Sequence, residues 1–422
     1  MPSRAEHTSG VTTGPDDAGQ DKSPGFLRAP SMSNVDALFA GYLATVPAMA
    51  GSLATALYFG ASTWGALTAI FRVYDYRVPR RAAPFVLSCI YCFFSVLVTS
   101  LLAGNIEALP PKILSFVSLL MVPLFVCRFR YSDPEQTLGF LCRYAPLGVF
   151  GGIGAFIVSD FDAGGAGNPN IFGLAIAVLG AISLAGVFVR NWYQRLAGLA
   201  GYCGALTAVV LSETRSMVLP MVLLPLLAIV LFKGANRYVV LGGVVLIGIV
   251  TASLSPIIIG QFEAGLKDIE TYGENTELTP LGARMTLWTA AVDAIADSPW
   301  VGYGVQNKMN AVYQRTDTTV AMPKYSHVHN EFLDSLVAGG IPALIGLIMV
   351  LFSPLLMVTA EPRHAMKNYV ICSMVVIFLF RALAGSFLTH DLVIVLFLIS
   401  VSIAAAFDLD RRDFVILRAK VD

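Results

Sequence analysis

The sequence predicts an all-α polytopic membrane protein with about 12 transmembrane helices and one large polar loop. Hydrophobic residues make up 56% of the 422 residues and charged residues only 13%, whereas soluble proteins carry about 25% charged residues. The mean hydropathy is +0.70. The apolar residues also fall in runs that are long enough to cross the roughly 30 Å hydrocarbon core of a bilayer.

The order of apolar and polar segments divides the chain into five parts. Residues 1–34 have no apolar core, and we expect them to form a disordered cytoplasmic tail. Residues 35–259 should hold transmembrane helices 1–9, and residues 260–333 should form a periplasmic loop with amphipathic helices. Residues 334–407 should hold helices 10–12, and residues 408–422 should form a second cytoplasmic tail.

Twelve apolar runs are the expected spans. The first two are close together and could instead form one span and a re-entrant segment. The runs are residues 35–53, 54–71, 84–104, 109–127, 140–159, 171–189, 194–212, 216–232, 238–259, 334–357, 368–386 and 390–407.

The positions of lysine and arginine test this topology, because cytoplasmic loops collect positive charge. With the N-terminus inside and alternating spans, 20 of the 28 residues fall on the cytoplasmic side. This pattern predicts that both termini are cytoplasmic and that the long loop faces outward. The other residues, five of which lie in the long loop, are Lys112, Arg215, Lys267, Arg284, Lys308, Arg315, Lys324 and Arg381.

The long loop contains a predicted amphipathic helix. Apolar residues recur at helical spacing from Leu281 to Ile295, Thr279 can cap the helix, and Pro280 suits its first position. We expect this helix to lie along the membrane surface, with Trp288 as an interfacial anchor.

Less regular segments flank this helix. The acidic stretch 268–277 should form turns or a short strand, whereas residues 302–304, Gly-Tyr-Gly, should turn the chain. A shorter helix over residues 306–313 then leads to two of the five histidines, His327 and His329. Histidines at the end of a polar loop beside a membrane span are candidates for chemistry.

Charge and cysteine positions argue against two kinds of partner. The formal net charge is zero and no basic, aromatic-interleaved surface is visible, so we expect no nucleic acid. All six cysteines fall within or at the edge of expected spans, where disulfides and a zinc site are not expected. The spacing of Cys89 and Cys92 is therefore assigned to packing.

Short motifs occur in a fixed order within residues 205–345. In this order and on this topology, they resemble the O-antigen ligase and polymerase superfamily, and the ligase branch in particular. The motifs are Ser212-Glu213-Thr214-Arg215, Arg284-Met285-Thr286-Leu287-Trp288, Asp297-Ser298-Pro299 with Gly302-Tyr303-Gly304, and His329-Asn330-Glu331-Phe332-Leu333 with Gly339-Gly340-Ile341.

The resemblance implies a glycosyltransferase C-type (GT-C) fold and a glycosyltransferase of the bacterial inner membrane. In the ligase branch, a glycan passes from undecaprenyl diphosphate to a sugar hydroxyl of lipid A-core at the periplasmic face, which completes lipopolysaccharide. The expected partners are therefore undecaprenyl-diphosphate-linked O-antigen, lipid A-core and membrane lipids.

Other functions stay open beside the ligase. An O-antigen polymerase and a protein O-oligosaccharyltransferase belong to the same superfamily, and a lipid-linked glycan transporter is the alternative that is not an enzyme. A single long outward loop and a short inward C-terminus favour the ligase. A transporter should show internal repeats, and none is visible.

Arginines are the predicted ligands of the diphosphate, because a leaving group that gains negative charge needs cations in a partly dry site. Arg215 lies between two apolar spans and Arg284 on the amphipathic helix, and both match family motifs. Arg381 is a third candidate without a motif. Pairing with Asp391 or snorkelling to lipid is the alternative for Arg381.

His329 is the predicted general base, which takes the proton from the acceptor hydroxyl as that oxygen attacks the anomeric carbon. Direct displacement of this kind inverts the anomeric configuration. His327 and Asn330 are expected to bind substrate. On a helix, residues two apart do not face each other, so we expect the two histidine rings to point apart.

No cofactor and no metal are expected, since the resemblance implies a metal-independent ligase. The alternative is a divalent ion at Asp160 and Asp162, with Asp268 and Glu270 as a looser candidate pair. Two carboxylates alone make a poor magnesium site.

Overall fold

The computed structural model describes residues 34–49, 51–71, 78–129, 134–159, 168–189, 191–231, 237–270, 279–316 and 324–406. Within these ranges the chain forms α-helices joined by loops and short 3-10 turns, without a β-strand. The helices are α1 (Asn34–Thr45), α2 (Gly51–Ile70), α3 (Ala83–Leu102), α4 (Pro110–Phe129), α5 (Pro134–Val158), α6 (Pro169–Ala185), α7 (Trp192–Leu211), α8 (Arg215–Leu231), α9 (Arg237–Glu270), α10 (Pro280–Asp297), α11 (Gly304–Tyr313), α12 (Glu331–Phe352), α13 (Ala365–Ala384) and α14 (Asp391–Ala405).

The described helices confirm an all-α polytopic membrane protein but not the number of spans. Each of the twelve expected runs coincides with a helix, α1–α9 or α12–α14. Seven described helices are long and apolar enough to cross a membrane: α3, α5, α6, α7, α9, α12 and α13. Helices α1, α8 and α14 have 12, 17 and 15 residues, fewer than the roughly 20 that a span needs.

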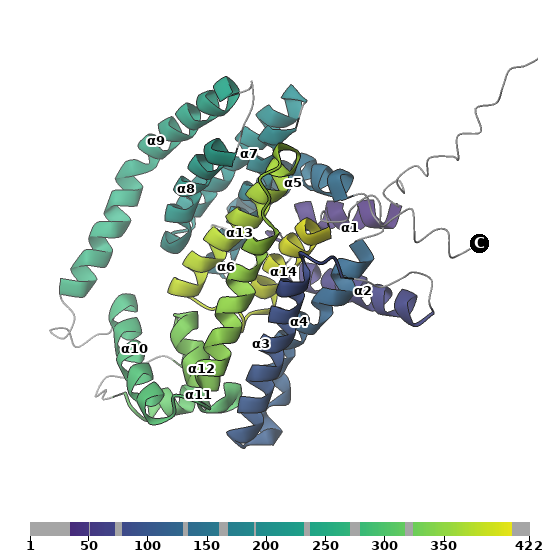
Figure 1. Cartoon of the computed structure of the whole chain (residues 1–422). Coiled ribbons are helices and arrows are strands. Elements are labelled where there is room, and N and C mark those ends of the chain that lie inside the picture. The colour runs from purple at the N-terminus through teal and green to yellow at the C-terminus, as the bar shows by residue number, and fades with distance from the viewer. Residues whose placement is uncertain are drawn as a thin grey trace, which may run out of the picture.

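The core of the bundle includes α6 and α14, which Figure 1 shows among the other helices in the middle of the molecule. All side chains from residue 171 to 185 in α6 and from 392 to 405 in α14 are buried. Helix α7 packs closely on α6, because a Cβ at Gly198 would lie only 2.4 Å from the carbonyl oxygen of Ser183. Close approach over small residues is typical of membrane helices.

Helix α9 lies at the edge of the bundle and is longer than expected. Figure 1 shows it at the left, and it packs on α7 and α8. The helix continues through Glu270, so the expected turn or strand is wrong for residues 268–270. Residues 261–270 contain Gln, Glu, Ala, Leu and Lys, whose helix propensities favour this extension.

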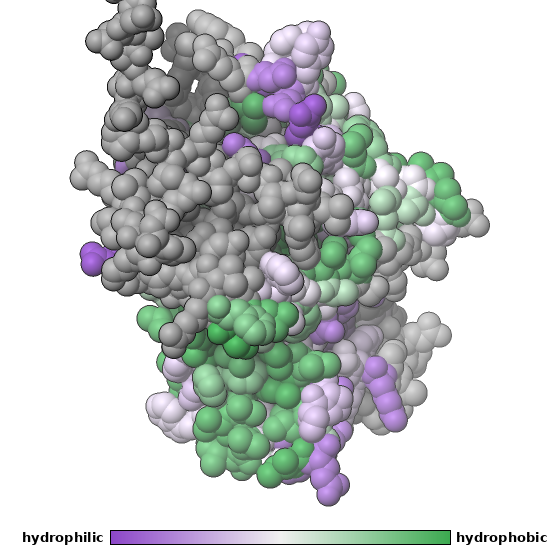
Figure 2. Space-filling view, turned by 90° about the vertical axis from the view of Figure 1, so that its right-hand side faces the viewer, coloured by the Kyte–Doolittle hydropathy of each residue, from purple (hydrophilic) through white to green (hydrophobic). Residues whose placement is uncertain are grey.

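The surface of the molecule carries broad apolar areas. Figure 2 shows one of them in green over the lower part of the face that it draws, with hydrophilic residues at its lower edge. Along α9 the exposed apolar side chains include Leu241, Val245, Ile249 and Phe262. Exposed apolar patches of this extent are expected on helices that face lipid.

Candidate active site

The site lies at one end of the bundle, where α10, α11 and the start of α12 come together. Figure 1 shows this group at the lower left, below the end of α9. Helix α10 contacts α9, α11 and α12, and α11 also contacts α3. A small apolar cluster, which includes Leu287, Ala291, Val312, Val328 and Val337, holds the group together.

The segment between α10 and α11 packs against a break in helix α12. Gly339 and Gly340 have non-helical backbone angles, with φ +62° and ψ −158° at Gly340. The N–H of Ile341 donates to the carbonyl of Pro299 at 2.8 Å, and a Cβ on Gly340 would lie 2.4 Å from the carbonyl carbon of Trp300. These two motif segments therefore fit each other, and their role is to fix α10 and α11 on α12.

Helix α10 begins as the sequence predicts. Thr279 Oγ1 accepts a hydrogen bond from the backbone N–H three residues later at 3.1 Å, and Pro280 is the first helical residue. The turn expected at residues 302–304 is confirmed, with φ +67° and +76° at its glycines. The indole N–H of Trp288 donates to the Val328 carbonyl at 2.8 Å. This hydrogen bond ties α10 to the histidine segment.

The two histidines lie in the segment 324–330, whose backbone is held from several sides. The N–H of Val328 donates to Asp334 Oδ1 at 3.2 Å, and the carbonyl of Val328 accepts from Trp288. Asn330 caps α12, because its Oδ1 accepts from the N–H groups of the second and third helix residues at 3.0 and 3.2 Å. His329 has φ +58°, a left-handed conformation that is uncommon for a residue with a Cβ.

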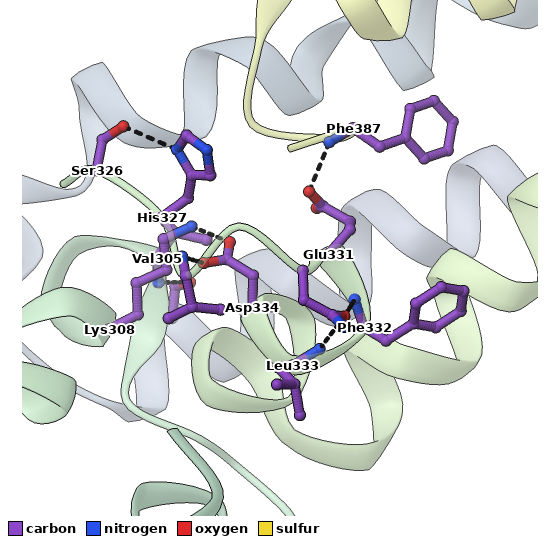
Figure 3. Close-up of polar contacts among 12 residues, drawn as sticks. Val305, Lys308, Ser326, His327, Glu331, Phe332, Leu333, Asp334 and Phe387 are labelled. Atoms are coloured by element: carbon purple, nitrogen blue, oxygen red, sulfur yellow. Dashed lines mark hydrogen bonds and ion pairs between the residues drawn. The ribbon is translucent and has the colours of Figure 1, made fainter. Parts of the chain in front are cut away.

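The rings of His327 and His329 lie side by side, with centroids 4.3 Å apart. The expectation that they point apart is wrong, because both residues precede α12 and lie in irregular backbone. The Tyr325 ring packs edge-on against His329 at 5.0 Å, and Ser326 Oγ lies 3.1 Å from His327 Nδ1 (Figure 3). Within the described ranges, no hydrogen bond occupies the ring nitrogens of His329.

Burial lowers the pKa of both imidazoles, to about 4 for His329 and to about 3 for His327. For His329, the positive charges of Arg284 and Arg381 lower the pKa further, and the carboxylate of Asp334 opposes them. Both rings are therefore neutral at pH 7, which is the form that a general base needs.

Arg215 is the first residue of α8, directly after the turn that ends α7. The buried Thr214 Oγ1 contacts Ser212 Oγ at 2.9 Å and donates to the first carbonyl of α6 at 3.0 Å. The hydroxyls of this Ser-x-Thr-Arg motif thus hold the turn, while the Arg215 side chain is exposed. Its Nη1 lies 3.4 Å from the position that a Cβ on Gly265 of α9 would take.

The three predicted arginines come together at the site, from α8, α10 and α13. Arg284 interacts electrostatically with Arg215, and Arg381 interacts with Arg284. Burial is the main cause that lowers the pKa of Arg284, and the charge of Arg215 adds to it. Among the described side chains, neither Arg215 nor Arg284 forms an ion pair with a carboxylate. Within the described ranges, the site therefore holds two cations without a carboxylate ion-pair partner.

Arg381 is buried at the end of α13 and held by the segment before α14. Its Nε donates to the Ser386 carbonyl at 2.9 Å, and the charge of Glu331 attracts it. Glu331 is 1% exposed, and its Oε2 accepts from the Phe387 N–H at 2.6 Å (Figure 3). The alternative pairing of Arg381 with Asp391 does not occur between these two described residues.

A buried ion pair that the sequence analysis missed lies behind the histidines. Lys308 of α11 pairs with Asp334 of α12, and the two residues are 4% and 2% exposed (Figure 3). One signal was available, since Lys308 follows Val305 and precedes Ala311 at the three-residue spacing of a helix face. A charge on an apolar face indicates a buried partner.

The acidic pairs that the sequence suggested as metal ligands fall elsewhere along the chain. Asp160 and Asp162 lie outside the described residues, and Asp268 and Glu270 belong to the last turn of α9. The described site instead offers guanidinium groups, which suit phosphate oxygens, beside a neutral imidazole that can accept a proton.

Long apolar helices define a multi-pass membrane protein, and a cationic, histidine-containing candidate site lies at one end of the bundle. Residues 201–348, about a third of the chain, match the family described as O-antigen ligase. The match includes Arg215, Arg284 and His329, and it confirms the resemblance read from the motifs. The family consists of glycosyltransferase-like membrane enzymes.

A curated relative is similar in sequence to part of the chain. An uncharacterized protein of Haemophilus influenzae is 28% identical over 167 residues, which are 35% of this chain and 41% of the relative. The chain thus spans about two fifths of the length of that relative.

Proposed function

We propose that the protein is an O-antigen ligase that transfers a glycan from undecaprenyl diphosphate to a sugar hydroxyl of lipid A-core. The reaction takes place at the periplasmic face of the bacterial inner membrane, with both chain termini in the cytoplasm. The observation that carries this proposal is that Arg284 and Arg381 act electrostatically on the neutral ring of His329, while Arg284 also interacts with Arg215. The O-antigen ligase match over residues 201–348 supports it independently.

Each group has a defined part in the transfer. A ring nitrogen of His329 takes the proton from the acceptor hydroxyl, whose oxygen attacks the anomeric carbon of the donor. The bond from that carbon to the diphosphate oxygen breaks, and its electron pair leaves with undecaprenyl diphosphate. The arginines stabilise the charge that develops on this leaving group, a role that ordinarily falls to preorganised cations. Attack opposite the leaving group inverts the anomeric configuration.

Binding of the donor also makes His329 a stronger base. In the free protein the charges of Arg284 and Arg381 contribute to the low pKa of His329, after burial. A diphosphate between the arginines offsets those charges, so the pKa of His329 rises toward the value that suits proton transfer near neutral pH. The base is thus activated when the donor is in place, without a metal ion.

The test is transfer of undecaprenyl-diphosphate-linked glycan to purified lipid A-core by the full chain in liposomes, with EDTA present. We expect product from the natural chain and at least a hundredfold less from His329→Ala, since general-base catalysis typically contributes 10²–10⁴-fold. His364→Ala is the matched control, because His364 lies in the connection between α12 and α13 and contacts Thr359 Oγ1 instead of the site. Equal rates for His329→Ala and the natural chain would overturn the base assignment.

The acceptor is tested in the same liposomes. Longer lipid-linked glycan in place of glycosylated lipid A-core would indicate a polymerase, and glycosylated protein would indicate a protein oligosaccharyltransferase. Loss of activity with EDTA that added Mg²⁺ restores would contradict the metal-independent mechanism. Movement of intact donor across the bilayer without a new glycosidic bond would indicate a transporter.

A further inference from the structure

The backbone of Val328, which lies between the two histidines, is fixed at both of its polar groups. Its carbonyl accepts from the indole N–H of Trp288 at 2.8 Å, and its N–H donates to Asp334 Oδ1 at 3.2 Å. The other oxygen of Asp334 pairs with Lys308 (Figure 3). The Val328 carbonyl is therefore held by a residue of α10, and the Val328 N–H is held by a residue of α12 that pairs with a residue of α11.

We propose that Trp288, Asp334 and Lys308 are positioning residues, which hold His327 and His329 in the arrangement that the transfer reaction needs. This inference rests on the proposed function, because it concerns the same site. The three residues act through Val328 and not through contact with substrate. We define the Trp288, Asp334 and Lys308 side chains as the histidine clamp.

The local backbone explains why a clamp is needed. His329 has φ +58°, and a residue with a Cβ keeps such a conformation only where its surroundings enforce it. Its imidazole makes a ring contact with Tyr325 and with His327, but no described hydrogen bond holds it. The position of the ring thus follows from the backbone on its N-terminal side, which is the peptide that the histidine clamp holds.

Burial of the Lys308 and Asp334 pair fits a positioning role better than a stabilising one. A buried ion pair contributes little to stability compared with apolar residues of similar size. Such a pair does fix one geometry, since both charges lose their compensation if the partners separate. The apolar cluster of α10 to α12 could hold these helices without it.

The histidine clamp also sets the charge near the imidazoles. The charged groups that face them are Arg284 of α10, Lys308 of α11, Asp334 of α12 and Arg381 of α13. Asp334 raises the pKa of both rings, whereas Lys308 lowers that of His327. Removal of one partner or the other therefore shifts the pKa of His327 in opposite directions, which loss of folding alone does not do.

The first experiment separates geometry from charge by three substitutions in the full chain. Trp288→Phe removes one hydrogen bond without a change of charge, and we expect kcat to fall at least tenfold with KM for the donor unchanged. Asp334→Asn keeps an oxygen that accepts from Val328 but loses the charge, and we expect the acid limb of the pH profile to move about one unit lower. Lys308→Met leaves Asp334 uncompensated, and we expect the pKa of His327 to rise.

Chemical modification of the histidines gives a readout that does not need transferase activity. The rate at which diethyl pyrocarbonate modifies His327 and His329 is followed against pH by peptide mass spectrometry, which reports the pKa of each ring. We expect lower pKa values of both rings in Asp334→Asn and a higher pKa of His327 in Lys308→Met. These shifts would support the histidine clamp even if the protein transferred no glycan to lipid A-core, and that result would contradict the proposed function alone.

A matched control uses the exposed ion pair of the same two helices. Arg315→Met removes a cation that follows α11 and pairs with Asp297 of α10, and we expect no change in histidine pKa. The Lys308→Met/Asp334→Asn double variant keeps the site testable if a single variant fails to fold, because no charge remains unpaired. Unchanged kcat in Trp288→Phe, or pKa shifts of equal sign in both single variants, would overturn the proposal.

Discussion

Two sets of charged residues at the same end of the bundle differ in how they are neutralised. Behind the histidines, Lys308 and Asp334 are buried and paired with each other. In front of them, Arg215 and Arg284 have no carboxylate partner among the described residues, although burial already lowers the pKa of Arg284. The difference indicates two tasks, because paired charges fix structure, whereas unpaired cations in a partly dry site attract an anion.

Removal of the unpaired cations should have the largest effect on activity. For Arg284→Met we expect kcat/KM to fall by about 10²–10³, the range seen when one preorganised donor to a developing charge is removed. Arg284→Lys keeps the charge without the planar fork and should recover part of the rate. The measurement is steady-state transfer at several donor concentrations. Full activity of Arg284→Met would contradict the assignment of the unpaired cations to binding of an anionic leaving group.

The close fit between the break in α12 and the turn that joins α10 to α11 should contribute to the stability of the fold more than to catalysis. Gly340→Ala puts a Cβ 2.4 Å from Trp300, at backbone angles that cost about 1–3 kcal/mol for other residues. We expect a loss of at least about 2 kcal/mol, seen as a lower midpoint of thermal unfolding by tryptophan fluorescence. Gly154→Ala in α5 is the control, since open space surrounds that position. Equal unfolding midpoints in the two variants would contradict the close fit between these two segments.

The pH profile should show how the unpaired cations act on the base. Because the pKa of His329 is lowered to about 4, kcat/KM should stay high at neutral pH and fall as the ring becomes protonated below that value. The donor offsets the charge of Arg284, so the acid limb of kcat should lie at higher pH than that of kcat/KM. In Arg284→Met the limb of kcat/KM should also move up, since a positive neighbour is gone. A shift to lower pH would contradict the assigned sign.

The exposed pair should show the smallest effect. Arg315 and Asp297 form an ion pair with side chains that are 24% and 62% exposed, and such pairs contribute about 0–1 kcal/mol. We expect Arg315→Met to transfer glycan at a rate within about twofold of the natural chain, with an unfolding midpoint close to it. A loss as large as that of Lys308→Met would mean that burial does not separate the two pairs.

Local patterns in the sequence predicted the elements that local physics determines. Thr279 and Pro280 marked the start of α10, and the glycines at 302 and 304 marked the turn before α11. The family motifs predicted that Arg215, Arg284 and His329 belong to one site, and in the structure Arg284 interacts electrostatically with each of the other two.

The contacts that the sequence could not predict join segments far apart in the chain. Glu331 bonds to the Phe387 N–H, and Lys308 pairs with Asp334, so neither partner is visible from its own neighbours. The two histidine rings were expected to diverge because a helix was assumed, whereas the left-handed residue His329 lies before the helix begins. The acidic end of α9 was expected to form turns because polar residues suggest a loop, although their helix propensity favours the helix.

The most direct test of the division between cations and base is donor binding measured beside turnover in the same variants. The ligand is undecaprenyl-diphosphate-linked glycan, titrated into nanodiscs that hold the natural chain, His329→Ala or the Arg215→Met/Arg284→Met double variant. We expect His329→Ala to bind the donor as tightly as the natural chain but to form no product, and the double variant to lose binding by at least tenfold. Undiminished binding by the double variant, or normal turnover by His329→Ala, would contradict these roles.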